Sequence, residues 1–352
     1  MKYVFIDGNN LAIRAAFAND YMTNSDGEDS GAHYGFFNSL INLKFKFPDY
    51  QFLVAWDSGS ARRKKETVSA KEAGIIKDTY KANRKRGKIA KPLASWFRTG
   101  HHLKNALSKT GIPQILMEGH EADDVIASYC EMLKGESESI VVVTSDHDYY
   151  QILDSNVVIW DGMKSDYVTK DSFENENGIS PKQHVDVGAL MGDTGDNIFG
   201  IPGWGIKTAI PAIKKNKTWE NVIADLEKKL LKYESEYSEL SDEEFDELSK
   251  KETKSGKPLY ADIYRNQPHI GLLKGFDNKK IKVAKKDLMA LLFKDRVKLA
   301  YSLKKMDLDI EGLPEIVSLE KDKGMLLEYF QYYDIVSLVD RVDLLFNPTE
   351  GI

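Results

Sequence analysis

Nine acidic residues recur at a few short, defined places within the first 200 positions of the chain. Asp7 and Asp57 each directly follow a run of apolar residues. The other acids fall in the segments GHEADDVIASYC, VVVTSDHDYYQIL and ALMGDTGDNIFG, and they are Glu121, Asp123, Asp124, Asp146, Asp148, Asp193 and Asp196. Ionised carboxylates that share a small volume need cations between them. If these acids converge in the fold, they therefore indicate a metal site.

Each acidic segment also has a simpler explanation. A helix N-terminus is stabilised by negative charge by about 0.3–1 kcal/mol, so Glu121 alone could be a helix cap. Asp146 and Asp148 could form a simple turn, and Asp193 and Asp196 could form Asx-turns between their glycines. Three carboxylates within four residues exceed what capping requires, however, and convergence of all the segments favours a shared chemical role.

The type of ligand limits which metal ions could bind. A set made of oxygen ligands, with no Cys or His cluster, suits Mg²⁺ or Mn²⁺. Two such ions about 4 Å apart can activate a water molecule and stabilise both oxygens of an in-line phosphoryl displacement. The pattern therefore predicts a phosphodiester substrate. No GxxxxGK[ST] loop is present, so ATP hydrolysis is not indicated.

If the acids converge, the strands and helices that carry them must end close to one another in the fold. Short apolar runs alternate with helix-length segments in the first half of the chain, and these runs are residues 3–6, 52–56, 140–144 and 157–160. This alternation predicts an α/β fold with a central, mostly parallel sheet and helices on both faces. Open sheets of this kind bind ligands beyond the carboxyl ends of their strands, which is where the acids fall.

The chain has 352 residues, enough for two domains. We expect an α/β core over residues 1–180 and a helical part over 181–352, with 219–254 a charged helical stretch and 325–345 an apolar helix or helix pair. The single cysteine, Cys130, excludes a disulfide framework and fits a reducing compartment. We expect neither a signal peptide nor a membrane span, and hence a cytoplasmic protein.

The net charge of −6 conceals strongly charged segments. Residues 62–91 contain twelve basic and three acidic residues, and residues 274–305 contain eleven basic and three acidic residues. Residues 220–254 instead contain twelve acidic and six basic residues. A basic segment can simply be a solvated helix face. The stretch 58–95 is nevertheless unusually long for a connection, which is typical of a functional insertion.

Ordered motifs give the sequence a family resemblance. FIDGNNLAIR, AWDSGSARRK, TYKANR, GHEADDVIA, TSDHDYYQIL and MGDTGDNIFGIPGWGIKTA occur in the order expected of the 5′ nucleases. Over residues 1–215 the chain resembles a stand-alone bacteriophage or bacterial flap endonuclease or 5′→3′ exonuclease, a group that includes phage ribonuclease H. The resemblance implies a 5′-nuclease/PIN-like core, a helical arch at about 58–95 and a helix–hairpin DNA-binding element at about 185–215.

The resemblance also implies roles for individual residues. One metal cluster would comprise Asp7, Asp57, Glu121, Asp123 and Asp124, and a second Asp146, Asp148, Asp193 and Asp196. Lys81 and Arg84 would be the catalytic basic pair on the arch. Tyr80 would stack on terminal bases, and Arg14 would bind nucleic acid near the active site. Gly203, Gly205, Lys207 and Thr208 would grip the duplex backbone, with a possible K⁺ ion.

The implied activity is hydrolysis near the 5′ end of flap, nicked or RNA-primed duplexes, in replication primer removal. The implied partners are branched or nicked duplex DNA and RNA–DNA hybrids, and the protein is expected to be a monomer. Pro211 departs from the family pattern because it would start the hairpin helix late or kink it. Three alternatives are a PIN-like ribonuclease, a catalytically inactive nucleic-acid-binding homologue and a phosphatase with a DxD nucleophile.

Overall fold

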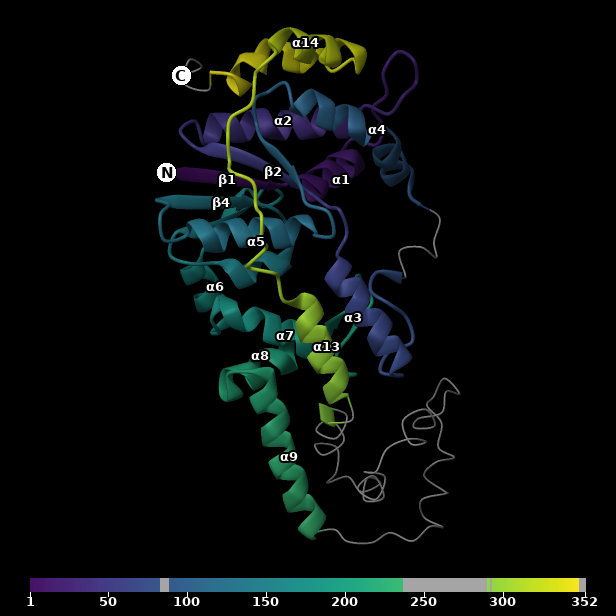
Figure 1. Ribbon diagram of the computed structural model, residues 1–352, viewed down its shortest axis with the longest axis vertical. Coiled ribbons are helices and arrows are strands. Elements are labelled where there is room, and N and C mark those ends of the chain that lie inside the picture. The colour runs from purple at the N-terminus through teal and green to yellow at the C-terminus, as the bar shows by residue number, and fades with distance from the viewer. Residues whose placement is uncertain (83–88, 237–289, 292, 348–352) are drawn as a thin grey trace. The chain divides into compact units, whose positions relative to one another are not determined.

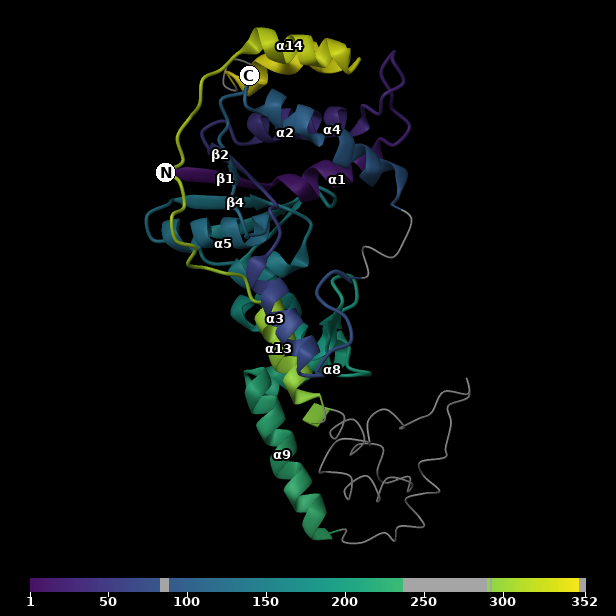
Figure 2. The same cartoon turned by 45° about the vertical axis from the view of Figure 1, so that its right-hand side comes forward.

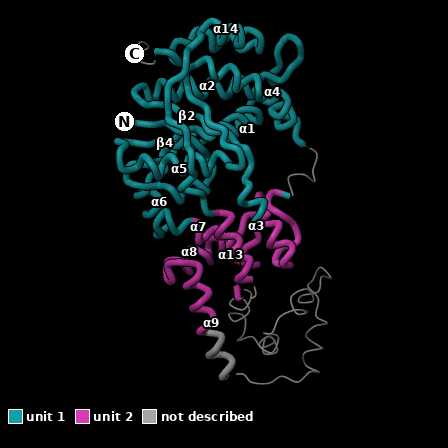
Figure 3. The backbone as a smooth tube through the Cα atoms, viewed as in Figure 1, with its two compact units in different colours: residues 1–65, 82–184, 305–352 teal, residues 66–81, 185–304 magenta. Residues whose placement is uncertain are grey.

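The computed structural model describes residues 1–82, 89–236, 290–291 and 293–347. The chain divides into two compact units, each assembled from separate stretches of sequence (Figure 3). Unit 1 comprises residues 1–65, 82–184 and 305–352, and unit 2 comprises residues 66–81 and 185–304.

A six-stranded sheet in the order β3-β2-β1-β4-β5-β6 forms the centre of unit 1. Its strands are β1 (Lys2–Asp7), β2 (Gln51–Trp56), β3 (Gln114–Leu116), β4 (Ser139–Val143), β5 (Val157–Asp161) and β6 (Asp166–Val168). The first five strands are parallel, and β6 is an antiparallel edge strand. The predicted mostly parallel α/β sheet is confirmed. Strands β3 and β6 were not predicted, because three residues are too few to show a period.

The register of the central strands brings their carboxyl ends to one edge. Strand β1 lies between β2 and β4, with Asp7 opposite Ala55 and Ile6 opposite Val143. The central residues are buried because these strands are covered on both faces. Asp7, Asp57 and Asp146 therefore leave the sheet at the same edge.

Helices cover both faces of the sheet in unit 1 (Figures 1 and 2). One face carries α1 (Gly8–Ala18), α2 (Gly31–Lys46), α4 (Lys91–Leu107), α14 (Lys323–Tyr332) and the 3₁₀ helix η5 (Val336–Leu345). The opposite face carries α5 (Ala122–Leu133), and α6 (Lys170–Asn177) follows β6 in the chain. The expected apolar helix pair at 325–345 corresponds to α14 and η5, whose buried residues join the main core.

Aromatic packing beneath α1 fixes where this helix begins. The Trp56 ring lies 5.9 Å from the rings of both Phe36 and Trp96. Gly8 passes so close to this cluster that a Cβ atom there would lie 2.6 Å from Trp56. Glycine at this position therefore lets helix α1 begin directly after Asp7, which holds that carboxylate at the sheet edge.

Unit 2 is mostly helical, as expected for the part of the chain after residue 180. Its elements include α7 (His184–Met191), the two-residue strands β7 (Gly192–Asp193) and β8 (Ile198–Phe199), α8 (Ile206–Asn216), α9 (Trp219–Glu236) and α13 (Lys294–Lys304). Helix α3 (Ala61–Glu72) continues from unit 1 into unit 2. No helix in the described ranges is long and apolar enough to cross a membrane.

Candidate active site

Asp7 and Asp57 lie at the carboxyl ends of β1 and β2. Asp7 is the N-cap of α1, and its Oδ1 accepts a hydrogen bond from the Asn10 backbone N–H at 2.9 Å. Asp57 accepts hydrogen bonds from the Asn9 side chain at 2.9 Å and from the Ala122 backbone N–H at 2.8 Å. The contact with Ala122 ties the end of β2 to the first residue of α5, so the two acidic segments are held together.

A buried arginine gathers the three acids at the start of α5. The Arg63 guanidinium, whose side chain is 2% exposed, contacts Glu121 at 2.5 Å, Asp123 at 3.3 Å and Asp124 at 3.0 Å. Glu121 is the N-cap residue of α5, but its side chain makes no capping hydrogen bond. Capping therefore does not explain this triplet, whereas charge pairing with one buried cation does.

Asp146 and Asp148 follow β4 at the start of the 3₁₀ helix η2 (His147–Ile152). The Asp146 side chain caps this turn by accepting a hydrogen bond from the Asp148 backbone N–H at 2.9 Å. In the next position, the buried Tyr149 hydroxyl donates to Oδ2 of Asp7 at 3.3 Å. The β4 segment is thereby linked to the end of β1. We refer to all seven acids as the core carboxylates: Asp7, Asp57, Glu121, Asp123, Asp124, Asp146 and Asp148.

Burial, with repulsion from neighbouring carboxylates, raises the pKa of two core carboxylates, Asp7 and Asp124. Burial raises the pKa of Asp7 to about 8, with repulsion from Asp57, Asp146 and Asp123 adding to the rise. Burial and repulsion from Asp123 also raise the pKa of Asp124, although Arg63 opposes the change. A site that disfavours its own negative charge in this way favours bound cations.

Asp193 and Asp196, the hairpin pair, lie in the β7–β8 turn of unit 2 and have basic partners of their own. Lys304 at the end of α13 contacts Oδ2 of Asp193 at 2.8 Å, and its side chain is only 10% exposed. Burial alone would raise the pKa of Asp193, but the Lys304 contact and backbone hydrogen bonds lower it below its usual value. The turn is further shaped by the Gly195 N–H, which donates to Oδ1 of Asp193 at 2.8 Å.

Asp196 holds the segment that carries Tyr80 and Lys81. The Tyr80 hydroxyl donates to Oδ2 of Asp196 at 3.1 Å, and the Lys81 Nζ lies 3.8 Å from the same oxygen. The Lys81 backbone N–H also donates to the Asp196 carbonyl at 2.9 Å. Lys81 adopts a left-handed backbone with φ of 54°, which is uncommon for a residue with a side chain. Several contacts therefore fix Lys81, so it differs from a freely moving surface cation.

Two models of one family match the chain. The model of the 5′-3′ exonuclease N-terminal resolvase-like domain matches residues 2–178, and that of the 5′-3′ exonuclease C-terminal SAM fold matches residues 179–251. The chain belongs to the 5′-3′ exonuclease family. It is accordingly a nuclease, as the order of its motifs predicts.

Relatives of known name agree with this assignment. The 5′-3′ exonuclease of Aquifex aeolicus is 32% identical over 264 residues, which cover 75% of this chain and 83% of that protein. The 5′-3′ exonuclease of Bacillus subtilis is 32% identical over 233 residues, covering 64% and 74%. DNA polymerase I of Caldicellulosiruptor bescii is 34% identical over 237 residues, covering 65% of this chain but only 26% of the polymerase.

Solved structures share the fold at low sequence identity. T5 5′-exonuclease with bound zinc has a TM-score of 0.52 at 17% identity, covering 87% of this chain and all of that one. The catalytic core of Rad2 in complex with DNA substrate has a TM-score of 0.53 at 15% identity, covering 97% and 92%. The fold of this exonuclease-family member is therefore also that of nucleases crystallised with metal ions or DNA.

The acids assigned by resemblance to the second metal cluster are divided between the two units of the exonuclease-family chain. Asp146 and Asp148 belong to unit 1, with the first predicted cluster, whereas Asp193 and Asp196 belong to unit 2. Among the residues that the structure describes, no three His, Cys, Asp or Glu side chains are arranged to hold a metal ion. Arg63, Lys304 and the Ala122 backbone N–H contact oxygens of Asp123, Asp193 and Asp57, respectively.

The other residues predicted to bind nucleic acid lie on α1 and around the start of α8, apart from Arg84. Arg14 lies on α1, where burial lowers its pKa and nearby Asp161 opposes that change. Gly203, Gly205, Lys207 and Thr208 lie in the turn before α8 and in its first residues, and Lys207 is exposed. Arg84 lies outside the described residues. Pro211 is inside α8, which begins at Ile206 and continues past the proline.

Three residues of this site were not singled out from the sequence. Arg63 was counted only as one of many basic residues, yet its burial sets the geometry of the acids at α5. Lys304 is 111 positions from Asp193, so no local pattern connects the two. Tyr149 directly follows Asp148, and its hydroxyl reaches Asp7, 142 positions away in the sequence.

Proposed function

We propose that this protein is a structure-specific 5′ nuclease that hydrolyses phosphodiester bonds near the 5′ end of flap, nicked or RNA-primed duplexes. Removal of replication primers is the cellular process that fits such substrates. The observation that carries the proposal is the set of seven core carboxylates at one edge of the sheet, of which Asp7 has its pKa raised to about 8 by burial and repulsion.

The core carboxylates fit divalent cations in charge and in donor type. They offer only oxygen atoms, and their mutual repulsion is relieved by positive charge. We propose that two or more Mg²⁺ or Mn²⁺ ions are held by Asp7, Asp57, Glu121, Asp123, Asp124, Asp146 and Asp148, with Asp193 and Asp196 of unit 2 as further ligands. When bound, the ions would supply Lewis-acid activation of water and stabilise the displaced oxygen. The zinc ions bound to T5 5′-exonuclease support metal use in this fold.

Basic and aromatic residues would act on the substrate directly. Lys81, which is fixed by its contacts with Asp196, would donate to the scissile phosphate, and Arg84 would provide a second cation there. Tyr80 would stack on a terminal base, an interaction worth about 1–3 kcal/mol per base. Arg14 would bind a phosphate near the sheet edge.

The turn before α8 would hold the duplex through its backbone. Gly203 and Gly205 carry no side chain to obstruct a phosphate, and Gly203 has a positive φ of 81°. The first N–H groups of α8 lack partners within the helix, so they favour an anion, and exposed Lys207 adds a point charge. A K⁺ ion in this turn is part of the proposal. Such contacts position a duplex without reading its sequence.

The proposed partners are branched or nicked duplex DNA and RNA–DNA hybrids, bound by a monomer. The Rad2 catalytic core, which was solved with a DNA substrate, supports duplex binding by this fold. Action in the cytoplasm is also proposed, and the single cysteine, a free buried Cys130, is consistent with that compartment.

The alternatives explain fewer of the observations. A PIN-like ribonuclease does not account for the match of residues 179–251 to the exonuclease C-terminal fold. An inactive binding homologue does not account for the retention of all seven core carboxylates. A phosphatase that uses Asp146 as a DxD nucleophile leaves Asp57 and the triplet held by Arg63 without a role.

A comparison of substrates tests the proposal. The protein is incubated with Mg²⁺ and 5′-labelled flap, nicked and RNA-primed duplexes, with blunt duplex, single-stranded RNA and p-nitrophenyl phosphate as controls. We expect cleavage near the 5′ end of at least one branched or nicked substrate, and no hydrolysis of p-nitrophenyl phosphate. Hydrolysis of the small ester alone would establish the phosphatase. Cleavage of single-stranded RNA in preference to every duplex would establish the PIN-like ribonuclease.

A further inference from the structure

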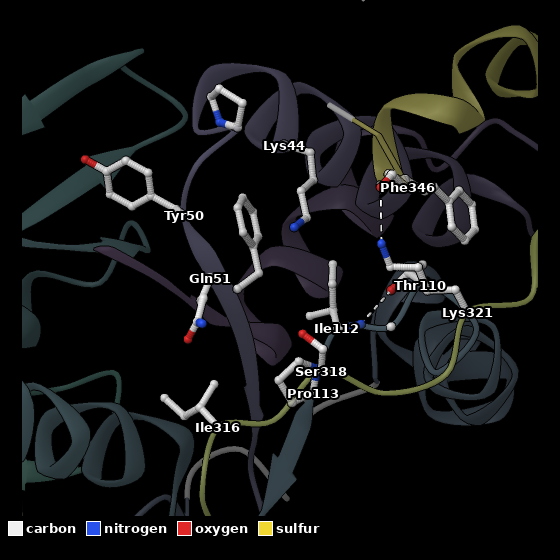
Figure 4. A pocket seen from close by; sticks show the side chains of 14 residues that line it. Lys44, Tyr50, Gln51, Thr110, Ile112, Pro113, Ile316, Ser318, Lys321 and Phe346 are labelled. Atoms are coloured by element: carbon white, nitrogen blue, oxygen red, sulfur yellow. Dashed lines mark hydrogen bonds between the residues drawn. The ribbon is translucent and has the colours of Figure 1, made fainter. Parts of the chain in front are cut away.

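A cavity lies at the opposite end of the sheet from the core carboxylates, entirely within unit 1. It has a volume of about 230 Å³ and opens near the amino-terminal ends of β2 and β3 (Figure 4). Strand β2 separates it from Asp57, and six extended residues span roughly 17–20 Å. A ligand in this cavity would therefore not occupy the nuclease site.

The cavity combines two cations with apolar walls. Lys44 from the last turn of α2 and Lys321 from the segment before α14 line it, together with the rings of Tyr50 and Phe52 and the side chain of Ile112. No acidic residue is among the described residues that line it. A small cavity with this composition resembles a binding site in which one charged group fixes an otherwise apolar ligand.

Lys44 is poorly compensated in this position. Its Nζ lies 4.1 Å from the centroid of the Phe52 ring, and no carboxylate among the described residues forms an ion pair with it. Burial, together with repulsion from the nearby charge of Lys321, lowers the pKa of Lys44 to about 8. An anion placed between the two lysines would relieve both the desolvation and the repulsion.

The wall that carries Lys321 is held in place by backbone contacts. Thr110 and Lys321 form an antiparallel β-bridge, flanked by hydrogen bonds from the Leu319 N–H to Gly111 and from the Asp322 N–H to Lys109. Lys321 also donates to the Phe346 carbonyl at 3.1 Å. Gly111 permits this close approach, because a Cβ atom there would lie 2.7 Å from the Lys321 side chain. The cavity is therefore largely formed before any ligand binds.

We infer that this cavity binds a small organic anion, with its carboxylate or phosphate between Lys44 and Lys321 and its apolar body against Tyr50, Phe52 and Ile112. The inference does not depend on the proposed nuclease function, because it concerns a separate set of residues. The cavity also differs from the turn before α8 in unit 2, which would contact phosphates through its exposed backbone and Lys207.

Calorimetric titration tests the inference with phenyl phosphate and benzoate as anionic probes and benzyl alcohol as the uncharged control. The wild-type chain should bind at least one anion and should not bind the alcohol measurably. The preferred anion distinguishes a phosphate site from a carboxylate site. No heat from either anion at about 10 mM, a concentration at which even a very weak site would be occupied, would overturn the inference.

Substitutions of Lys44 and Lys321 test whether the anion binds in this cavity. Lys44→Met should weaken anion binding by about tenfold or more, equivalent to about 1.4 kcal/mol, and Lys321→Met should weaken it less. Lys44→Arg should retain binding, which separates loss of charge from misfolding. The matched control is Lys46→Met, which removes the same charge from an exposed residue of the same helix. Equal affinities for wild type and Lys44→Met would overturn the assignment, whatever the wild-type affinity. Nuclease activity should be unchanged in Lys44→Met.

Discussion

The core carboxylates of unit 1 and the hairpin pair of unit 2 are acids of the same kind in opposite electrostatic environments. Asp7 is buried among other carboxylates, and its pKa is raised to about 8. Asp193 lies against Lys304, and its pKa is lowered. Asp196 likewise has Lys81 3.8 Å away. The chain thus supplies lysine partners to the hairpin pair, whereas Asp7 at the sheet edge is surrounded by other carboxylates.

This difference indicates which carboxylates would be neutralised by metal ions from solution. Arg63 balances part of the charge at the start of α5 through its contacts with Glu121, Asp123 and Asp124. Bound divalent ions would complete the balance at the sheet edge. At the hairpin, an ion would instead have to compete with Lys304 for Asp193. We therefore expect the core carboxylates to dominate metal binding and catalysis.

The largest loss of cleavage should come from substitution of the acids that follow β4. Asp146→Asn or Asp148→Asn should abolish cleavage and leave DNA binding largely intact, because both acids are proposed metal ligands that make no contact with DNA. Single-turnover cleavage and equilibrium binding measure the two properties. Asp166→Asn, the same change at an exposed residue of β6, is the control. Turnover within about tenfold of wild type in both variants would exclude the metal assignment for this pair.

A smaller loss should follow from Lys81→Ala. If Lys81 meets charge that develops in the transition state, the saturating single-turnover rate should fall by about 10²-fold. If it only contributes to binding, KM should rise and that rate should be unchanged. Lys77→Ala removes an exposed lysine of the same segment and serves as the control. Small and equal effects of both substitutions would show that Lys81 acts only as one of several basic residues that bind the substrate.

Thermal stability in EDTA should separate the two groups of acids. Asp7→Asn removes a carboxyl group whose ionisation the folded state opposes and keeps the capping oxygen, so Tm should rise by roughly 2–5 °C. Asp193→Asn leaves the nearly buried Lys304 without its carboxylate, so Tm should fall by a similar amount, roughly 2–5 °C. Differential scanning calorimetry measures both changes. Tm changes of the same sign in the two variants would contradict the proposed electrostatic difference between the core carboxylates and the hairpin pair.

The stability gained by Asp7→Asn should depend on pH. Because the folded pKa of Asp7 is about 8 and its ordinary value is 3.8, the folded state holds this proton more tightly. In EDTA, the contribution of Asp7 to stability is therefore full below about pH 4 and is lost as the pH rises toward 8. The difference between variant and wild type should grow over that interval. A difference that stays constant from pH 4 to 8 would show that Asp7 titrates normally.

The smallest expected effect concerns duplex binding by unit 2. Binding should be independent of sequence and weakened by salt, with a log–log slope of about −0.9 for each phosphate neutralised. Lys207→Ala should reduce the magnitude of that slope by about one. Lys214→Ala, at an exposed position near the other end of α8, should leave it unchanged. A preferred base at the cleavage site would contradict backbone-only contacts.

Much of the sheet edge could be predicted because its signals are local. The apolar runs before Asp7, Asp57 and Asp146 mark buried strands, and parallel strands align their carboxyl ends. The fold class and the grouping of these three acids followed from that pattern. The return of residues 305–352 to unit 1 did not follow from any local pattern, because it depends on packing between segments that are distant in sequence.

The cations around the acids were harder to predict because their partners are distant in sequence. Arg63 lies within four consecutive basic residues, and only its burial distinguishes it. Thr67 and Ala70 are also buried and share one helical face with Arg63, but this burial is known only from the structure. No such periodicity connects Lys304 with Asp193, so that pair needed the tertiary structure.

Titration of Mn²⁺ into EDTA-treated, dialysed protein tests the central claim most directly, because it measures ion binding without requiring a substrate. We predict that the wild-type chain binds Mn²⁺, that Asp7→Asn weakens this binding by about tenfold or more, and that Asp166→Asn binds like wild type. Asp193→Asn should retain at least one Mn²⁺ site, because the core carboxylates remain. The absence of Mn²⁺ binding by the wild-type chain at millimolar concentration, or full binding by Asp7→Asn, would contradict the account.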